Sequence, residues 1–248
     1  MTVEEKRWSQ YSEKSEAILY YFLGFFNMRE AKNPAGTISK KCINNLKCLI
    51  RMISWVESKH GKAGANQPTR DPMQTGNPGD AWWKELTGQS GRGSRFVGGP
   101  GHPNYWAKQL CKAFIKDLKA RIKRLENANK KLIKKPGGLP SDRFFEVLRS
   151  NERYIIMYSH WLRNIQWSCS AAAKKSGHRN AKFEPCMSFF WGTLYLLHKI
   201  RRGPFYKIDC QSCEKLITKA IDYNGGGDPK YGEKLRQTHK EIGCCKDS

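Results

Sequence analysis

Hydrophobic residues recur every three or four positions along most of the chain, which is the spacing of an amphipathic helix. The clearest stripe lies in 39–59 and consists of Leu46, Leu49, Ile50, Ile53 and Val56. The same spacing predicts helices over 12–30, 39–59, 104–133, 142–167, 187–201, 211–222 and 230–242. Alternation of the strand type is sparse and no internal repeat is visible. The sequence therefore predicts a mainly α fold.

Segments rich in glycine and proline interrupt this helical pattern. Residues 61–103 form the longest interruption, and loops of that length in a compact domain are often functional. Residues 134–140 form a second break, after which Ser141 is placed to cap the next helix. The apolar run 17–26 has half of the about 20 residues that a membrane span needs, so we expect it to be a buried helix.

Composition adds a strong positive charge to this picture. Hydrophobic residues make up 39% of the 248 residues, which favours a packed core over disorder. Lys and Arg number 45 against 22 Asp and Glu, for a formal net charge of +23 that attracts polyanions. Residues 108–135 carry 11 of these cations against only Asp117 and Glu126. A solvated basic face and a polyanion-binding face both remain open for this helix.

The nine cysteines are an odd number, so at least one is unpaired in a monomer. The polar N-terminus lacks the apolar core of a secretory signal, and we therefore expect synthesis in the cytoplasm with mostly reduced thiols. Cys210-x-x-Cys213 and Cys244–Cys245 could each supply half of a zinc site. Their mutual spacing matches no common zinc module, and we predict neither a metal nor a cofactor.

The first candidate for chemistry is Glu57, which ends an apolar helix beside Trp55 and Val56 and precedes the long polar loop. A carboxyl group in partly apolar surroundings has its charged form disfavoured. It can then stay protonated near neutral pH and act as a general acid. From this position alone, a surface glutamate at a helix end is the alternative.

Four short motifs, taken together, favour the catalytic interpretation of Glu57 over a surface glutamate. They are Glu57-Ser58, Met73-Gln74, the segment 192–196 (GTLYL) and the segment 223–226 (YNGG). Their order resembles that of the lytic transglycosylases and goose-type lysozymes, glycoside hydrolase family 23. Asp71-Pro72 stands where the family has Gly-Leu, and residues 81–186 have no counterpart.

The resemblance implies one lysozyme-like helical domain over 1–248 with a sugar-binding cleft, in which 81–186 is a divergent or inserted helical region. Glu57 would protonate the glycosidic oxygen and then act as base, and Tyr223 would help to set its position. Asp71 is a candidate base for water, since inverting hydrolysis needs a second carboxylate about 6.5–9.5 Å away; shaping the Asp-Pro turn is its alternative role. The predicted sugar contacts are Ser58, Gln74, Asp80, Trp82, Tyr195 and Asn224.

Several aromatic residues lie in the long loop or just after it. They are Trp82, Trp83, Phe96, Tyr105 and Trp106. Flat apolar rings can cover the CH faces of a sugar while polar groups fix its orientation. The same rings could instead anchor the loop to the core, and the sequence does not choose between the two roles.

The function that the resemblance implies is cleavage of β-1,4-linked amino-sugar polymers, by transglycosylation or by hydrolysis. Peptidoglycan is the favoured substrate and chitin the alternative, and such an enzyme would have to be released or delivered to the cell wall. Two other classes stay open: a basic nucleic-acid-binding protein, although no common binding signature is present, and a catalytically inactive lysozyme-like domain.

Overall fold

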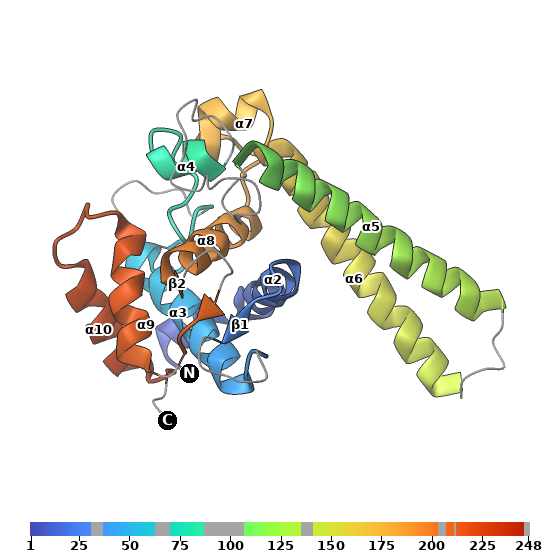
Figure 1. Cartoon of the computed structure of the whole chain (residues 1–248), viewed down its shortest axis with the longest axis horizontal. Coiled ribbons are helices and arrows are strands. Elements are labelled where there is room, and N and C mark those ends of the chain that lie inside the picture. The colour runs from blue at the N-terminus through green and yellow to red at the C-terminus, as the bar shows by residue number, and fades with distance from the viewer. Residues whose placement is uncertain are drawn as a thin grey trace.

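The computed structural model describes residues 1–30, 37–62, 70–86, 107–134, 141–202, 207–210 and 212–245. It is mainly helical (Figure 1), which confirms the predicted fold class. The α-helices are α1 (Val3–Trp8), α2 (Ser12–Phe25), α3 (Lys40–Ser58), α4 (Ala81–Leu86), α5 (Ala107–Lys134), α6 (Ser141–Ser168), α7 (Ala171–Ser176), α8 (Pro185–Ile200), α9 (Cys213–Ala220) and α10 (Tyr231–Ile242). Short 3-10 turns cover Gly177–Arg179 and Ile221–Asn224.

Three two-residue strands form a small sheet that the sequence did not predict. They are β1 (Arg29–Glu30), β2 (Arg201–Arg202) and β3 (Lys207–Ile208). β3 lies between the other two, parallel to β1 and antiparallel to β2. The sheet explains why the first long helix ends at Phe25 rather than near residue 30. The helices α1, α4 and α7 were also missed, because each has only six residues and shows no full apolar period.

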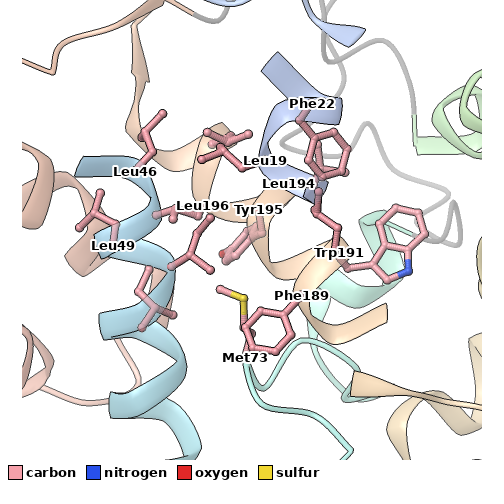
Figure 2. Packing of buried hydrophobic residues seen from close by; sticks show 14 of the residues in the cluster. Leu19, Phe22, Leu46, Leu49, Met73, Phe189, Trp191, Leu194, Tyr195 and Leu196 are labelled. Atoms are coloured by element: carbon pink, nitrogen blue, oxygen red, sulfur yellow. The ribbon is translucent and has the colours of Figure 1, made fainter. Parts of the chain in front are cut away.

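Helix α8 lies at the centre of the core. Apart from His198 and Lys199 in its last turn, its residues are mostly apolar on all sides, as expected for a buried helix, and Pro185 begins it at a position that tolerates proline. Phe189, Trp191 and Leu194 are among its buried residues, and α2 packs against it through the apolar run 17–26 (Figure 2). The prediction that this run is a buried helix is confirmed. No helix among the described residues is long and apolar enough to cross a membrane.

Helix α3 carries Glu57 on its last turn, and both of its ends are fixed. The Ser39 hydroxyl accepts a hydrogen bond from the amide of Cys42 at the start. After Ser58 the backbone turns through Lys59 and His60, whose φ angles of 50° and 56° are left-handed. The ring of His60 is buried and contacts Glu4 of α1 at 2.8 Å, so the N-terminal helix braces this end of α3.

Helices α5 and α6 pack against each other along their lengths and project from the rest of the molecule (Figure 1). We call this pair the arm. Both were predicted within a few residues, and both lie inside the region 81–186 that the motifs left unmatched. The apolar stripe of α5 is buried where the arm meets the body, at Leu110, Phe114 and Leu118.

Eight of the nine cysteines form disulfides, which corrects the expectation of mostly reduced thiols. The pairs are Cys42–Cys210, Cys48–Cys244, Cys111–Cys169 and Cys213–Cys245, and Cys186 is buried and free. The first two pairs join residues 168 and 196 positions apart, a proximity that only the folded chain creates. The sulfurs considered as halves of a zinc site are all engaged in these bonds.

Candidate active site

A pocket of about 640 Å³ opens between the end of α3, the segment 70–80 and α8. It is lined by Glu57, Arg70, Gln74, Asn77, Asp80, Trp82, His178, Arg179, Tyr195, Tyr223 and Asn224. All four motifs contribute a lining residue, although they are separated by up to 167 positions in the chain, from Glu57 to Asn224. Among the residues predicted for the site, only Ser58 and Asp71 do not line the pocket.

Glu57 is half-buried, and its pKa is raised to about 7. Burial is the largest cause, because it disfavours the charged form. The nearby hydroxyl of Tyr231 lowers the pKa of Glu57, although it makes no hydrogen bond of normal geometry. The carboxylates of Asp71 and Asp228 raise this pKa further, and the Lys234 ammonium lowers it. A substantial fraction of the Glu57 carboxyl groups is therefore protonated at neutral pH.

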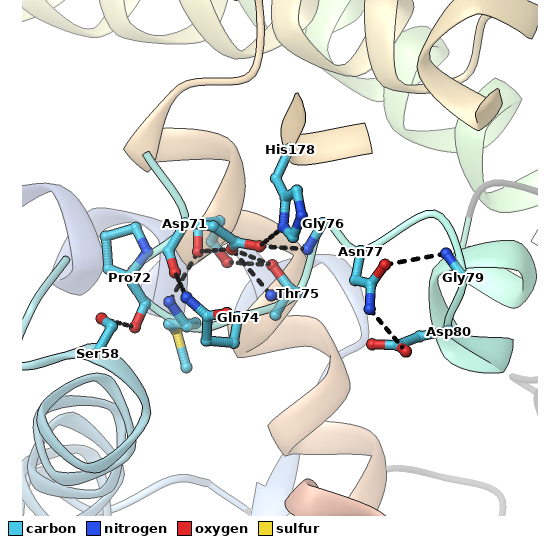
Figure 3. A network of polar contacts seen from close by, with 12 residues as sticks. Ser58, Asp71, Pro72, Gln74, Thr75, Gly76, Asn77, Gly79, Asp80 and His178 are labelled. Carbon is cyan, nitrogen blue, oxygen red and sulfur yellow. Dashed lines mark hydrogen bonds and ion pairs between the residues drawn. The ribbon is translucent and has the colours of Figure 1, made fainter. Parts of the chain in front are cut away.

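The Asp71 carboxylate organises the turn that follows it (Figure 3). It is fully buried and accepts hydrogen bonds from the amides of Thr75 and Gly76 at 2.8 and 2.7 Å, and from the Ser188 hydroxyl at 2.6 Å. The Nδ1–H of His178 donates to it at 2.9 Å. With its oxygens engaged and no surface on the pocket, Asp71 is not placed to activate water. The geometry matches its alternative role, which is to shape the turn.

Gln74 stands at the top of this turn, with a left-handed φ of 50° that is uncommon for a residue other than glycine. Its side-chain amide donates to the carbonyl of Asp71 at 2.9 Å, and its side chain lines the pocket. The neighbouring carbonyl of Met73 accepts a hydrogen bond from the Tyr223 hydroxyl at 3.0 Å. Tyr223 thus holds the turn in place, and its own raised pKa reflects burial and then the nearby charge of Glu57.

Ser58 connects the end of α3 to the same turn. Its side chain is only 2% exposed, and its hydroxyl donates to the carbonyl of Pro72 at 2.7 Å (Figure 3). The amide of Gly61 donates to that hydroxyl at 2.7 Å. The expected sugar contact of Ser58 is therefore replaced by a positioning role beside Glu57.

The two adjacent tryptophans of α4 have different surroundings. Trp82 lines the pocket and stacks on Tyr195, with ring centroids 5.3 Å apart and planes 28° apart. Trp83 is completely buried and meets Phe183 edge-on. Trp83 thus has the anchoring role considered for the aromatic residues, whereas Trp82 lies where a ring would be available to a ligand in the pocket. Phe96, Tyr105 and Trp106 lie outside the described residues.

Four lining residues were not predicted: Arg70, Asn77, His178 and Arg179. The first two flank the Asp71–Gln74 turn, so their nearness to a motif was an available signal. His178 and Arg179 come from the unmatched region, and they reach the pocket because the amide of His178 donates to the carbonyl of Gly76 at 2.7 Å. No local pattern in the sequence reveals that contact.

Asp80 is the other carboxylate that lines the pocket. It is half-buried, and burial is the main cause that raises its pKa. The side-chain amide of Asn77 donates to it at 3.0 Å (Figure 3). The site thus combines one acid whose pKa lies near neutral pH, one further carboxylate, two arginines and a stacked aromatic pair.

Comparison with known proteins identifies no relative of this chain. No protein-family model matches the chain, and no curated protein or solved structure matches it significantly. The resemblance of the four motifs, together with the geometry of the pocket, therefore carries the functional argument.

Proposed function

We propose that this protein is a glycosidase of the lysozyme-like kind that cleaves β-1,4-linked amino-sugar polymers, with Glu57 as the proton donor. The observation that carries the proposal is a carboxyl group with a pKa of about 7 in a pocket where the four motifs meet. A general acid works best when its pKa lies near the working pH.

Transglycosylation is the reaction that this arrangement favours. Protonated Glu57 gives its proton to the glycosidic oxygen, and the bond from that oxygen to C1 breaks. The resulting carboxylate then takes the proton of the 6-hydroxyl on the same sugar, whose oxygen bonds to C1 and closes an anhydro ring. One carboxyl group suffices for both steps, and Asp71, the expected base for water, is engaged in the turn.

Hydrolysis is the second candidate, and the position of Asp80 on the pocket favours it. There Asp80 would hold the water that attacks C1, while Glu57 protonates the leaving oxygen. Mass spectrometry of the products separates the two reactions. An anhydro end supports transglycosylation, whereas a reducing end that requires Asp80 supports hydrolysis.

Peptidoglycan is the substrate class that the pocket supports best. Arg70, Arg179 and His178 line it together with Glu57. Peptidoglycan carries carboxylates on the peptides attached to its muramic acid residues, which cations can bind, whereas chitin is uncharged. Digestion of peptidoglycan and of chitin oligomers of equal length, each with wild type and Glu57→Gln, tests the proposal. Cleavage of peptidoglycan by the wild type alone supports it, and no cleavage of either polymer contradicts it.

A further inference from the structure

The exposed side of α5 carries a row of lysines along the arm, which Glu126 and Asn127 interrupt once between Lys123 and Lys130. The row consists of Lys112, Lys116, Lys119, Lys123, Lys130 and Lys134, and all six are exposed. Successive members are three, four or seven residues apart, which places them on one face of the helix. At 1.5 Å per residue, the row is about 33 Å long. It is therefore a linear array of positive charge rather than a local cluster.

Charge on the arm is one-sided. Arg124 and Lys131 flank the row, and Glu126 is the only exposed acidic residue on α5. The exposed charges of α6 are nearly balanced, with four arginines against Asp142, Glu146 and Glu152. Solubility alone would be served by a mixed surface on both helices. The asymmetry indicates a partner that meets α5.

The lysine row has no structural use within the described part of the chain. The carboxylate of Asp117 pairs with Arg121 at 2.6 Å, off the row. None of the six lysines forms an ion pair with a described residue. Their charges are therefore available to an external polyanion, which would release its own counterions on binding.

We propose that the lysine row binds a linear phosphodiester polymer that carries no bases, of the kind attached to a cell wall. Lysine ammonium groups are point charges suited to phosphates in a flexible chain, whereas base recognition uses stacked rings or the planar fork of arginine. The single aromatic residue of α5, Phe114, is buried, and the exposed rings Phe145 and Tyr154 belong to α6. If the proposed function holds, the arm would keep the enzyme on the wall that carries its amino-sugar substrate.

Binding of poly(glycerol phosphate) to the full chain, measured by isothermal titration at several salt concentrations, tests this inference. The key variant replaces Lys116, Lys119, Lys123 and Lys130 by Gln, a comparably good helix former. We expect log affinity to fall linearly with log salt for the wild type, with a slope shallower by about three in the variant. The matched control replaces the exposed residues Arg143, Arg149, Arg153 and Arg163 of α6 by Gln, and it should keep the wild-type slope.

An equally reduced salt slope in the two variants would show that only net charge matters and would overturn the proposal. So would single-stranded DNA of equal charge binding more tightly than poly(glycerol phosphate), which would indicate a nucleic-acid surface. The readout needs no catalysis, so Glu57→Gln should bind the polymer as wild type does. An inactive protein that still binds through α5 would contradict the proposed function alone, and an active protein without such binding would contradict this inference alone.

Discussion

At the scale of single residues, the site depends on one carboxyl group that burial keeps partly neutral. The pKa of Glu57 is raised from 4.5 to about 7, so the folded protein holds this proton at pH values where the unfolded chain has lost it. Glu57 therefore lowers the free energy of unfolding progressively as the pH rises from 4.5 to 7. Above pH 7 its destabilising contribution stays constant.

This linkage can be measured by denaturant unfolding at pH 4.5 and pH 8. Glu57→Gln removes the titrating group while keeping its size, so the stability of the variant relative to wild type should rise between the two pH values. The exposed Glu233→Gln is the control and should show no such rise. A constant difference between Glu57→Gln and wild type would mean that the pKa of Glu57 is not raised.

Asp71 is expected to matter for stability rather than for proton transfer. Asp71→Asn keeps the shape but replaces an acceptor oxygen by an NH₂ group facing donors such as the amides of Thr75 and Gly76. A buried hydrogen-bond mismatch of this kind costs about 1–3 kcal/mol. Thermal unfolding should show that loss, and exposed Asp222→Asn should not. A fully stable Asp71→Asn that has lost all activity would instead support a direct role in catalysis.

At the scale of elements, the long helices were predicted from the sequence, whereas the six-residue helices and the turns were not. The apolar stripe of 39–59 predicted α3, and with it the position of Glu57 on the last helical turn. The turn at 71–76 depends on Ser188 and His178, which are more than 100 residues away, so nothing local encodes its shape. The motif resemblance nevertheless predicted that Gln74 of that turn lines the pocket, because a family motif records residues that meet only in the folded chain.

The close approach of α8 to this turn requires a glycine at position 192. A Cβ there would lie 2.7 Å from the sulfur of Met73 and 2.9 Å from the hydroxyl of Tyr223. Gly192→Ala should therefore displace the turn and destabilise the protein by about 1–3 kcal/mol, despite the better helix propensity of alanine.

Thermal unfolding and glycan cleavage should both report the effect of Gly192→Ala. The control is Gly24→Ala in α2, where a Cβ meets nothing within 4 Å and the propensity gain of about 0.5–1 kcal/mol should appear as stabilisation. If Gly192→Ala were as stable and active as Gly24→Ala, the contact between α8 and the Met73 turn would not govern the site.

At the scale of the whole molecule, two of the four disulfides join segments from the two ends of the sequence. Cys42–Cys210 and Cys48–Cys244 link α3 to the C-terminal region and thereby hold the helix that carries Glu57. Such bonds are typical of proteins that fold in an oxidising compartment, and we propose one for this protein. No local pattern pairs these cysteines, because each partner is more than 160 positions away.

Thiol counting and unfolding together test the disulfides. Alkylation of the unfolded, unreduced protein followed by mass spectrometry should modify one cysteine, Cys186. Replacing Cys48 and Cys244 by Ser should lower the unfolding free energy by up to about 5 kcal/mol, from the loop-closure entropy of the unfolded chain. Nine modified cysteines, or an unchanged midpoint for the double variant, would contradict this account.

The most direct test of Glu57 as the proton donor is the initial rate of glycan release from purified peptidoglycan between pH 5 and 9, for wild type, Glu57→Gln and Glu233→Gln. Wild type and Glu233→Gln should be fully active at low pH and lose activity as the pH rises through about 7, while Glu57→Gln should be slower by about 10²–10⁴-fold throughout. Release by Glu57→Gln at the wild-type rate would contradict the account.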